Sequence, residues 1–318
     1  MTSPTKKPEW LRVRLPNGDG QKEFNALKDR FREMQLHTVC EEARCPNIFE
    51  CWSQGTATIM ILGGTCTRGC RFCSVQKGHP GGTVDHAEPK NTAIALSKMG
   101  LAYVVMTMVD RDDLHDGGAA HVSETIHEIR ALNPTLRIET LVGDFQGVQR
   151  DVATLVQTGA PDVFAHNVEV VPRLQRKIRD VRCSWERSEQ VLRWAKELGA
   201  AVTKSSLMVG ISETDDEVFD ALDRLKNANV DVVTIGQYLR PTKKHANVER
   251  YVSPDTFERY REHAESLGFL FVASGPLVRS SYRAAEAFLS ERLAATTPVS
   301  SPMDRYGRKT HLRVISSS

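Results

Sequence analysis

The sequence predicts an α/β fold in which parallel strands alternate with helices. Apolar runs of strand length recur from residue 58 onward, and segments with helical spacing of apolar residues lie between them. The run at 101–106 is continuously apolar, which is typical of a parallel strand buried on both faces. No Gly-x-Gly-x-x-Gly motif follows the first run, and this counts against a dinucleotide-binding doubly wound sheet. Six or seven such units fit a partial TIM-type barrel.

The individual elements follow from this alternation and from the residues at their ends. The strands are predicted at Thr58–Leu62, Tyr103–Met108, Leu136–Leu141, Asp162–His166, Val202–Val209, Asp231–Gly236 and Phe269–Ala273. The helices are predicted at 21–34, Asn91–Met99, Ala119–Leu132, Gln146–Thr158, Trp185–Leu198, Asp215–Asn227 and Pro254–Leu267. Thr214 and Glu217 match a capping box. Left-handed residues after helices are predicted at Gly100, Gly159, Gly199 and Gly268.

Composition and charge exclude several classes of protein. A chain of 318 residues is within the range of an α/β barrel. The net charge of +2 gives no global field for binding nucleic acid or a membrane. No stretch approaches the roughly 18 apolar residues that cross a membrane, and the first ten residues lack the apolar core of a secretory signal. We therefore expect a cytoplasmic protein with neither a nucleic-acid nor a membrane partner.

Three cysteines follow the first predicted strand. Cys66, Cys70 and Cys73 have three and then two residues between them, after a turn-forming Gly-Gly pair. A short loop with this spacing can wrap three thiolates around one inorganic centre. A four-iron cluster normally takes four thiolates. Three ligands therefore leave one iron free, as a catalytic zinc site keeps an open position.

A second group of cysteines precedes the first strand. Cys40, Cys45 and Cys51 have four and then five residues between them, so the two groups use six of the seven cysteines. Such grouping indicates metal ligands in a reducing compartment rather than disulfides. Cys183 has no partner nearby in the sequence and is interpreted as structural. Structural zinc remains an alternative, with a fourth ligand from His37, His79 or His86.

Polar residues follow nearly every predicted strand, where barrel enzymes keep their catalytic groups. Each alone could cap a helix or bind water, but together they predict one polar mouth. They include Asp110, Asp112, Asp113, Glu139, His166, Asn167, Glu169, Lys204, Ser205, Gln237, Arg240, Arg279, Ser280 and Ser281.

The first group of cysteines, with Phe72 before the last of them, resembles the signature of the radical S-adenosylmethionine (SAM) enzymes. Both groups together resemble lipoyl synthase, a likeness that covers roughly residues 8–285. Further matching motifs lie at 109–118, 138–141, 166–169, 236–239 and 279–282. Three residues depart from the family pattern: Gly143, Ser206 and Ser212.

The resemblance implies a partial (βα)6 TIM-type barrel with N- and C-terminal extensions. The expected parts are an extension at 1–57 with the second cysteine group, a barrel at 58–275 and a C-terminal segment at 276–295. Residues 296–318 match nothing in the family and are expected to be disordered.

The resemblance also implies two [4Fe-4S] clusters and a sulfurtransferase reaction. One cluster, on Cys66, Cys70 and Cys73, cleaves SAM into a radical that removes hydrogen from the sixth and eighth carbons of an octanoyl-lysine. The other cluster donates the two sulfur atoms. Further SAM contacts fall on Glu139, Asn167 and Lys204. The ligands of the sulfur-donating cluster fall on Cys40, Cys45, Cys51 and a serine of the Arg-Ser-Ser-Tyr motif, for which we choose Ser281 over Ser280.

The implied partners are octanoylated lipoyl carrier domains, reduced ferredoxin or flavodoxin as electron donor, and an iron–sulfur carrier protein. The carrier domains include those of 2-oxoacid dehydrogenase acyltransferase subunits and the glycine cleavage H protein. Basic residues could dock an acidic carrier or form a solvated face: Arg240, Lys243, Lys244 and Arg250. Rival interpretations are another sulfur-inserting radical SAM enzyme such as biotin synthase, a non-catalytic iron–sulfur electron carrier, and a zinc-stabilised binding module.

Overall fold

A computed structural model describes residues 6–11, 25, 29 and 56–281 of the chain. Cys40, Cys45 and Cys51 lie outside these residues, as do the predicted segments at 296–318 and beyond residue 281. Of the helix predicted at 21–34, only Asn25 and Asp29 are described, and both are helical. Within this part of the chain, no helix is long and apolar enough to cross a membrane.

Seven parallel strands form one sheet in the order in which they occur in the chain. They are β1 (Thr56–Ile61), β4 (Tyr103–Met108), β5 (Arg137–Leu141), β6 (Val163–Ala165), β7 (Val202–Val209), β8 (Val232–Gln237) and β9 (Phe271–Gly275). In the described residues the outer strands β1 and β9 each pair with one neighbour, so the sheet does not close on itself. The predicted α/β partial barrel is confirmed, with six βα units followed by a seventh strand.

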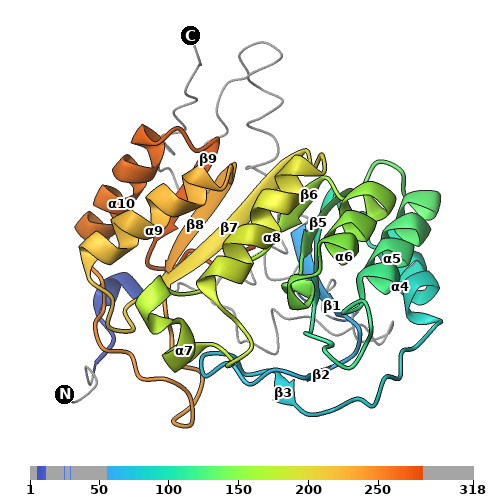
Figure 1. Ribbon diagram of the computed structural model, residues 1–318, viewed down its shortest axis with the longest axis horizontal. Coiled ribbons are helices and arrows are strands. Elements are labelled where there is room, and N and C mark those ends of the chain that lie inside the picture. Colours follow the sequence, from blue (N-terminus) through green and yellow to red (C-terminus); the bar gives the residue numbers. More distant parts are fainter. Residues whose placement is uncertain (1–5, 12–24, 26–28, 30–55, 282–318) are drawn as a thin grey trace.

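The helices cover one face of this sheet (Figure 1). They are α4 (Glu88–Ser97), α5 (Ala119–Leu132), α6 (Gln149–Ala153), α7 (Gln175–Ile178), α8 (Trp185–Glu197), α9 (Asp215–Asn227) and α10 (Pro254–Ser266). Each longer helix buries the face with helical spacing; α9 does so with Val218, Ala221, Leu222 and Leu225. Thr214 and Glu217 form the predicted capping box at its start.

Two helices differ from the prediction by three residues or more at one end, and α4 is the first, because it begins at Glu88 rather than Asn91. The helix predicted at 146–158 begins at Gln149 and passes into a π-helical turn over Thr154–Gly159. Ala160 then takes the left-handed conformation expected for Gly159, with φ of 47°. The wider π turn moves the end of the helix by one residue, which local sequence signals do not reveal. Gly100, Gly199 and Gly268 have positive φ as predicted.

The opposite face of the sheet carries the barrel interior. Its apolar part is a small cluster of Tyr103, Val105, Val163, Val202 and Val232. Among these side chains lies a buried ion pair between the Nζ of Lys204 and the carboxylate of Glu139, at 2.9 and 3.0 Å. The Tyr103 hydroxyl donates to the same carboxylate at 2.9 Å. Both charges are 2% exposed or less, so each depends on the other for its solvation.

Removing one partner of this pair should be costly. We expect Lys204→Met to lower the free energy of unfolding by about 3–5 kcal/mol, because it leaves the Glu139 carboxylate buried without its counter-charge. The double variant Glu139→Gln/Lys204→Met should lose less than the sum of the two single variants, because no buried charge is left alone. Denaturant unfolding of all three variants measures both effects.

The half-exposed pair between Lys196 and Asp231 provides a matched control. We expect Lys196→Met to cost about 1 kcal/mol or less, because solvent screens this pair. Additive losses for the Glu139 and Lys204 variants would contradict the interpretation that the two charges stabilise one another.

Candidate active site

The three thiols lie on the loop after β1, and a short β ladder closes this loop at both ends. β2 (Thr65–Cys66) pairs in parallel with β3 (Gln76–Lys77). The N–H of Gly78 donates to the carbonyl of Cys66 at 3.0 Å. Leu62, where the chain leaves β1, has a φ of 66°, which is uncommon for a residue other than glycine. The chain thus turns sharply out of the sheet and into a closed loop, which we call the thiol loop (residues 66–73).

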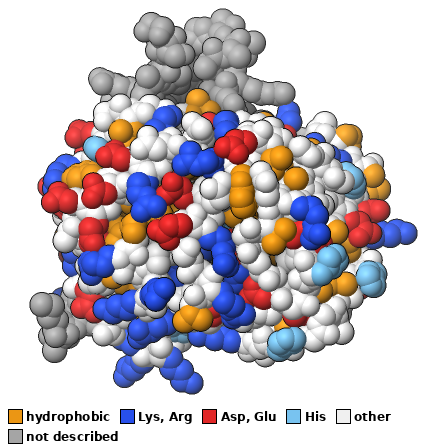
Figure 2. Space-filling model, in the orientation of Figure 1, with side chains coloured by type: hydrophobic (Ala, Val, Ile, Leu, Met, Phe, Trp, Pro, Cys, Tyr) orange, Lys and Arg blue, Asp and Glu red, His pale blue; other side chains and the backbone are white. Residues whose placement is uncertain are grey.

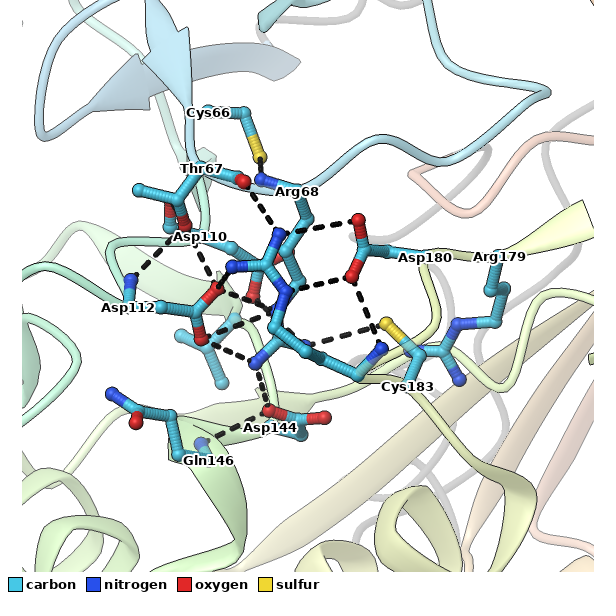
Figure 3. A network of polar contacts seen from close by, with 12 residues as sticks. Cys66, Thr67, Arg68, Asp110, Asp112, Asp144, Gln146, Arg179, Asp180 and Cys183 are labelled. Atoms are coloured by element: carbon cyan, nitrogen blue, oxygen red, sulfur yellow. Dashed lines mark hydrogen bonds and ion pairs between the residues drawn. The ribbon is translucent and has the colours of Figure 1, made fainter. Parts of the chain in front are cut away.

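The guanidinium of Arg68 holds the thiol loop from inside the protein (Figure 3). It donates to both carboxylate oxygens of Asp112, at 2.7–3.3 Å, and to Oδ1 of Asp144 at 2.6 Å. Burial alone would raise the pKa of both carboxyls, but the Arg68 guanidinium holds the pKa of each below its usual range. The sequence motifs include Asp112 but give no sign that Arg68 is its partner. These charge-assisted bonds fix the loop on the strand ends of β4 and β5.

Two later loops hold the outer side of the thiol loop. The N–H of Arg71 donates to the carbonyl of Ile178 at 2.7 Å, which ties the loop to the end of α7. The N–H of Ala246 donates to the carbonyl of Arg71 at 2.9 Å. The Nε2 of His245 lies 3.1 Å from the carbonyl oxygen of Cys73. The segment after β8 therefore packs directly on the backbone that carries the thiols.

All three thiols of the loop line one cavity of about 420 Å³, within the range of small-molecule sites. They are half-buried and form no disulfide. Burial and the charge of Asp110 raise the pKa of the Cys66 thiol to about 11, and burial raises the pKa of Cys73. The thiols are therefore protonated at neutral pH, and iron binding would have to displace these protons.

The arrangement fits a [4Fe-4S] cluster. In the described part of the chain, no three His, Cys, Asp or Glu side chains are placed to hold a single metal ion. A cluster does not require such convergence, because each thiolate binds a different iron of the cube. Three free thiols on one loop that all line the same cavity meet this requirement.

Cys183 is not isolated, although its sequence neighbourhood offered no partner. Its side chain is buried in the cavity wall, and its Sγ accepts from Nη1 of Arg68 at 3.4 Å. A hydrogen bond from the Cys70 thiol lowers the pKa of Cys183 to about 7 and raises that of Cys70. Cys183 thus belongs to the polar network beneath the thiol loop (Figure 3).

The remaining walls of the cavity come from the carboxyl ends of the strands, as predicted. Apolar side chains form much of them: Met60, Phe72, Val75, Met108, Val109, Leu141, Val142, Leu207, Met208, Tyr238, Leu239 and Val278. The Nδ2 of Asn167 donates to Oε1 of Glu169 at 3.2 Å within this wall. Glu169 has a φ of 67°, a strained conformation of the kind that clusters at functional sites.

His166 is held neutral in the same wall. Its Nδ1 donates to the carbonyl of Val142 at 2.8 Å, which leaves Nε2 to accept from the Ser188 hydroxyl at 2.9 Å. Burial, reinforced by the nearby charge of Arg179, lowers the pKa of His166 to about 4. The imidazole therefore carries no charge at neutral pH, and its two hydrogen bonds hold the chain in place directly after β6.

The Arg-Ser-Ser segment after β9 reaches the same cavity. Ser280 and Ser281 both line it. The chain just before this segment lies so close to β8 that a Cβ on Gly236 would be 2.1 Å from the carbonyl oxygen of Val278. The Nη1 of Arg279 donates to the carbonyl of Gln237 at 3.3 Å. Glycine in β8 thus allows a late part of the chain to face the thiol loop.

The structure does not bring every predicted site residue to the cavity. Asn167 lines it, but Glu139 and Lys204 do not, because they are paired with each other in the barrel interior. The role of Glu139 and Lys204 as SAM contacts stays a prediction. Cys40, Cys45 and Cys51 lie outside the described residues.

The departures from the family pattern also have structural consequences. Ser212 has a φ of 120°, which explains why glycine suits this position. A Cβ on Gly143 would lie 2.2 Å from Oδ1 of Asp110, so glycine here leaves room for that carboxylate. Ser206 is buried in β7 and lines the cavity.

Comparisons with solved structures agree with this architecture. Streptococcus suis SuiB bound to precursor peptide SuiA matches with a TM-score of 0.53 and 9% identity, over 79% of this chain and 52% of that one. HydG, a maturase of the [FeFe]-hydrogenase, matches with a TM-score of 0.50 and 11% identity, over 87% of this chain and 64% of that one. At these identities the likeness concerns the fold alone.

Comparisons of sequence are more specific. The model of the radical SAM superfamily matches residues 60–225, and that of the N-terminal domain of lipoyl synthase matches residues 2–45. Lipoyl synthase of Sorangium cellulosum is 57% identical over 92% of this chain and 83% of its own length. A mitochondrial lipoyl synthase of Sordaria macrospora is 51% identical, over 91% of this chain and 66% of its own length. The apicoplast lipoyl synthase of Plasmodium knowlesi is 49% identical, over 97% of this chain and 67% of its own length. With three free thiols gathered at the mouth of a partial barrel, the chain belongs to the lipoyl synthase family of radical SAM enzymes.

Proposed function

We propose that this protein inserts two sulfur atoms into an octanoyl group on a lysine of a carrier domain, at its sixth and eighth carbons. The proposal rests on one observation: three free thiols, a long apolar wall and the Arg-Ser-Ser segment all line the same cavity. An unactivated hydrocarbon chain needs apolar walls, and radical chemistry needs a site that excludes water. The family membership supports the same reaction.

Cys66, Cys70 and Cys73 would hold one [4Fe-4S] cluster at this cavity, with SAM at its open iron. When bound, this cluster supplies the electron that cleaves SAM, and a second cluster supplies the sulfur atoms. The chain's own contribution is placement. Arg68 fixes the thiol loop, and the apolar wall directs the acyl chain toward it. Asn167 lines the same wall and is proposed as a SAM contact.

The second cluster is proposed on Cys40, Cys45 and Cys51, with Ser281 as fourth ligand. The choice of Ser281 is supported by its place in the cavity wall. It is far from the thiol loop in the sequence but lines the same cavity. A serine oxygen binds iron more weakly than a thiolate, which suits a cluster that is consumed as it gives up sulfur.

The proposed partners are an octanoylated lipoyl carrier domain as substrate, a reduced ferredoxin or flavodoxin, and an iron–sulfur carrier protein that rebuilds the second cluster. The carrier domains of 2-oxoacid dehydrogenases and the glycine cleavage H protein are candidate substrates. We propose the cytoplasm as the location of this chain, although relatives carry the names of mitochondrial and apicoplast enzymes.

The central experiment is one anaerobic incubation of the reconstituted protein with reductant, SAM and an octanoyl-lysine peptide. We expect the peptide to gain two sulfur atoms while two molecules of 5′-deoxyadenosine form, measured by mass spectrometry. Cys70→Ala should abolish 5′-deoxyadenosine formation, because the SAM-binding cluster loses a ligand. Cys45→Ala should preserve it but stop sulfur insertion.

These outcomes separate the rival functions. 5′-Deoxyadenosine without sulfur on the peptide would keep the radical SAM reaction and reject this substrate. Neither product, from protein shown by iron and sulfide analysis to hold both clusters, would instead support an electron carrier.

The choice between the two serines has its own test. We expect Ser281→Ala to slow sulfur insertion about tenfold or more, in line with the loss of a group that tunes a metal site. The first SAM cleavage should persist, because the thiol loop is untouched. Ser280→Ala is the matched control and should retain sulfur insertion; the reverse pattern would move the ligand to Ser280.

A further inference from the structure

A second hollow, of about 270 Å³, lies on the outer side of the thiol loop. It is formed by Arg71 of that loop, by the end of α7 and by the segment after β8. We call it the basic hollow, and its lining residues are Arg71, Lys177, Ile178, Ile211, Arg240, Lys243, Lys244, His245, Ala246, Asn247 and Glu249. Figure 2 shows Lys and Arg side chains gathered over this region, at the lower left of the molecule. Only Glu249 contributes an acidic side chain to this lining.

Most of the positive side chains here form no ion pair with an acidic side chain of the described residues. Arg71, Lys177, Lys243 and Lys244 are exposed, and none has an acidic partner within 4.0 Å among the described residues. Arg250 differs, because its guanidinium is paired with Asp215 at 2.8 Å and is not part of the lining. Arg240 is half-buried and donates to the carbonyl of His245, which shapes the segment. Four positive charges on one face, without an acidic partner in the described part of the chain, create a strong local potential despite the small net charge.

The thiol loop separates this hollow from the cavity. The side chains of Cys66, Cys70 and Cys73 line the cavity, whereas Arg71, between the last two, lines the basic hollow. His245 also lines the hollow and reaches through to the carbonyl oxygen of Cys73, 3.1 Å from its Nε2. The backbone of the thiol loop and the ring of His245 thus lie between the three thiols and the basic hollow.

This geometry provides an entry for electrons that does not cross the cavity. Each cleavage of SAM consumes one electron, which must arrive while SAM and the acyl chain fill the cavity. Transfer between proteins falls steeply with distance, so the donor must dock where the protein wall is thin. The side of the thiol loop that faces away from the cavity meets both conditions.

We propose that the basic hollow is the docking face of an acidic one-electron carrier protein, of the flavodoxin or ferredoxin kind. The inference rests on the proposed function, which requires such a donor. Electron-transfer encounters are small and short-lived, and complementary charge mainly raises their rate of association. The donor is oxidised by one electron at each encounter and then leaves. An acylated carrier domain fits less well, because its lysine must enter the cavity on the other side of the loop.

The test reverses two charges at the rim of the basic hollow, in Lys243→Glu/Lys244→Glu. The matched control Lys90→Glu/Lys98→Glu makes the same change of charge at exposed positions on and directly after α4. The cluster-loaded proteins are titrated with purified acidic flavodoxin in a calorimeter, at low and at high salt. Formation of 5′-deoxyadenosine is then followed with reduced flavodoxin and, separately, with dithionite.

We expect the reversal at 243 and 244 to weaken flavodoxin binding roughly tenfold or more at low salt, and to remove most of its salt dependence. The flavodoxin-driven rate should fall in parallel, whereas the dithionite-driven rate should stay within about twofold of the parent protein, because the thiol loop is unchanged. The control at 90 and 98 should bind flavodoxin like the parent.

Unchanged flavodoxin affinity in the Lys243→Glu/Lys244→Glu variant would overturn the proposal. So would an octanoylated carrier domain that loses affinity while flavodoxin does not, since the face would then belong to the carrier. No SAM cleavage by the parent protein with dithionite would count against the proposed function instead, and the calorimetric comparison would still decide the docking face.

Discussion

The buried guanidinium of Arg68 joins three parts of the chain that lie far apart in the sequence. It binds Asp112 after β4 and Asp144 after β5, and Arg68 itself belongs to the loop that carries the three thiols. A buried charge of this kind is stable only when its hydrogen bonds are satisfied, so the thiol loop cannot shift without breaking several charge-assisted bonds. The position of the thiols therefore depends on the alignment of the strand ends beneath them.

That alignment is a property of the parallel sheet. Consecutive strands pair in sequence order, so the chain returns to the same edge of the sheet after each βα unit. Several polar residues after the strands, among them Asp110, Asn167 and Gln237, therefore line a single cavity. The same edge carries Ser188, which binds His166, the strained Glu169 and the close approach between Gly236 and Val278. Local strain is concentrated where the cavity is built and is balanced by the packed core between sheet and helices.

The thiol loop separates two environments with different chemistry. Its inner side faces an apolar cavity, and its outer side faces exposed lysines and arginines. An apolar site protects reactive species from water, whereas a basic surface attracts an acidic protein from solution. A loop of eight residues can serve both because Cys66, Cys70 and Cys73 line the cavity while Arg71 lines the basic hollow. Substrate entry and electron entry need not compete in such a structure.

The alternation of apolar runs and helical segments was sufficient to predict all seven strands and the barrel class, because burial on both faces and helix end signals are encoded locally. The spacing of the two cysteine groups likewise indicated the family, since residue types and separations are read directly from the chain. Tertiary contacts decided the rest. Glu139 and Lys204 lie 65 residues apart in the sequence, and only the register of the sheet makes them partners. Cys183 reaches Arg68 from 115 residues away. Such pairings depend on how the strands and loops pack in space, and no local pattern in the chain records them.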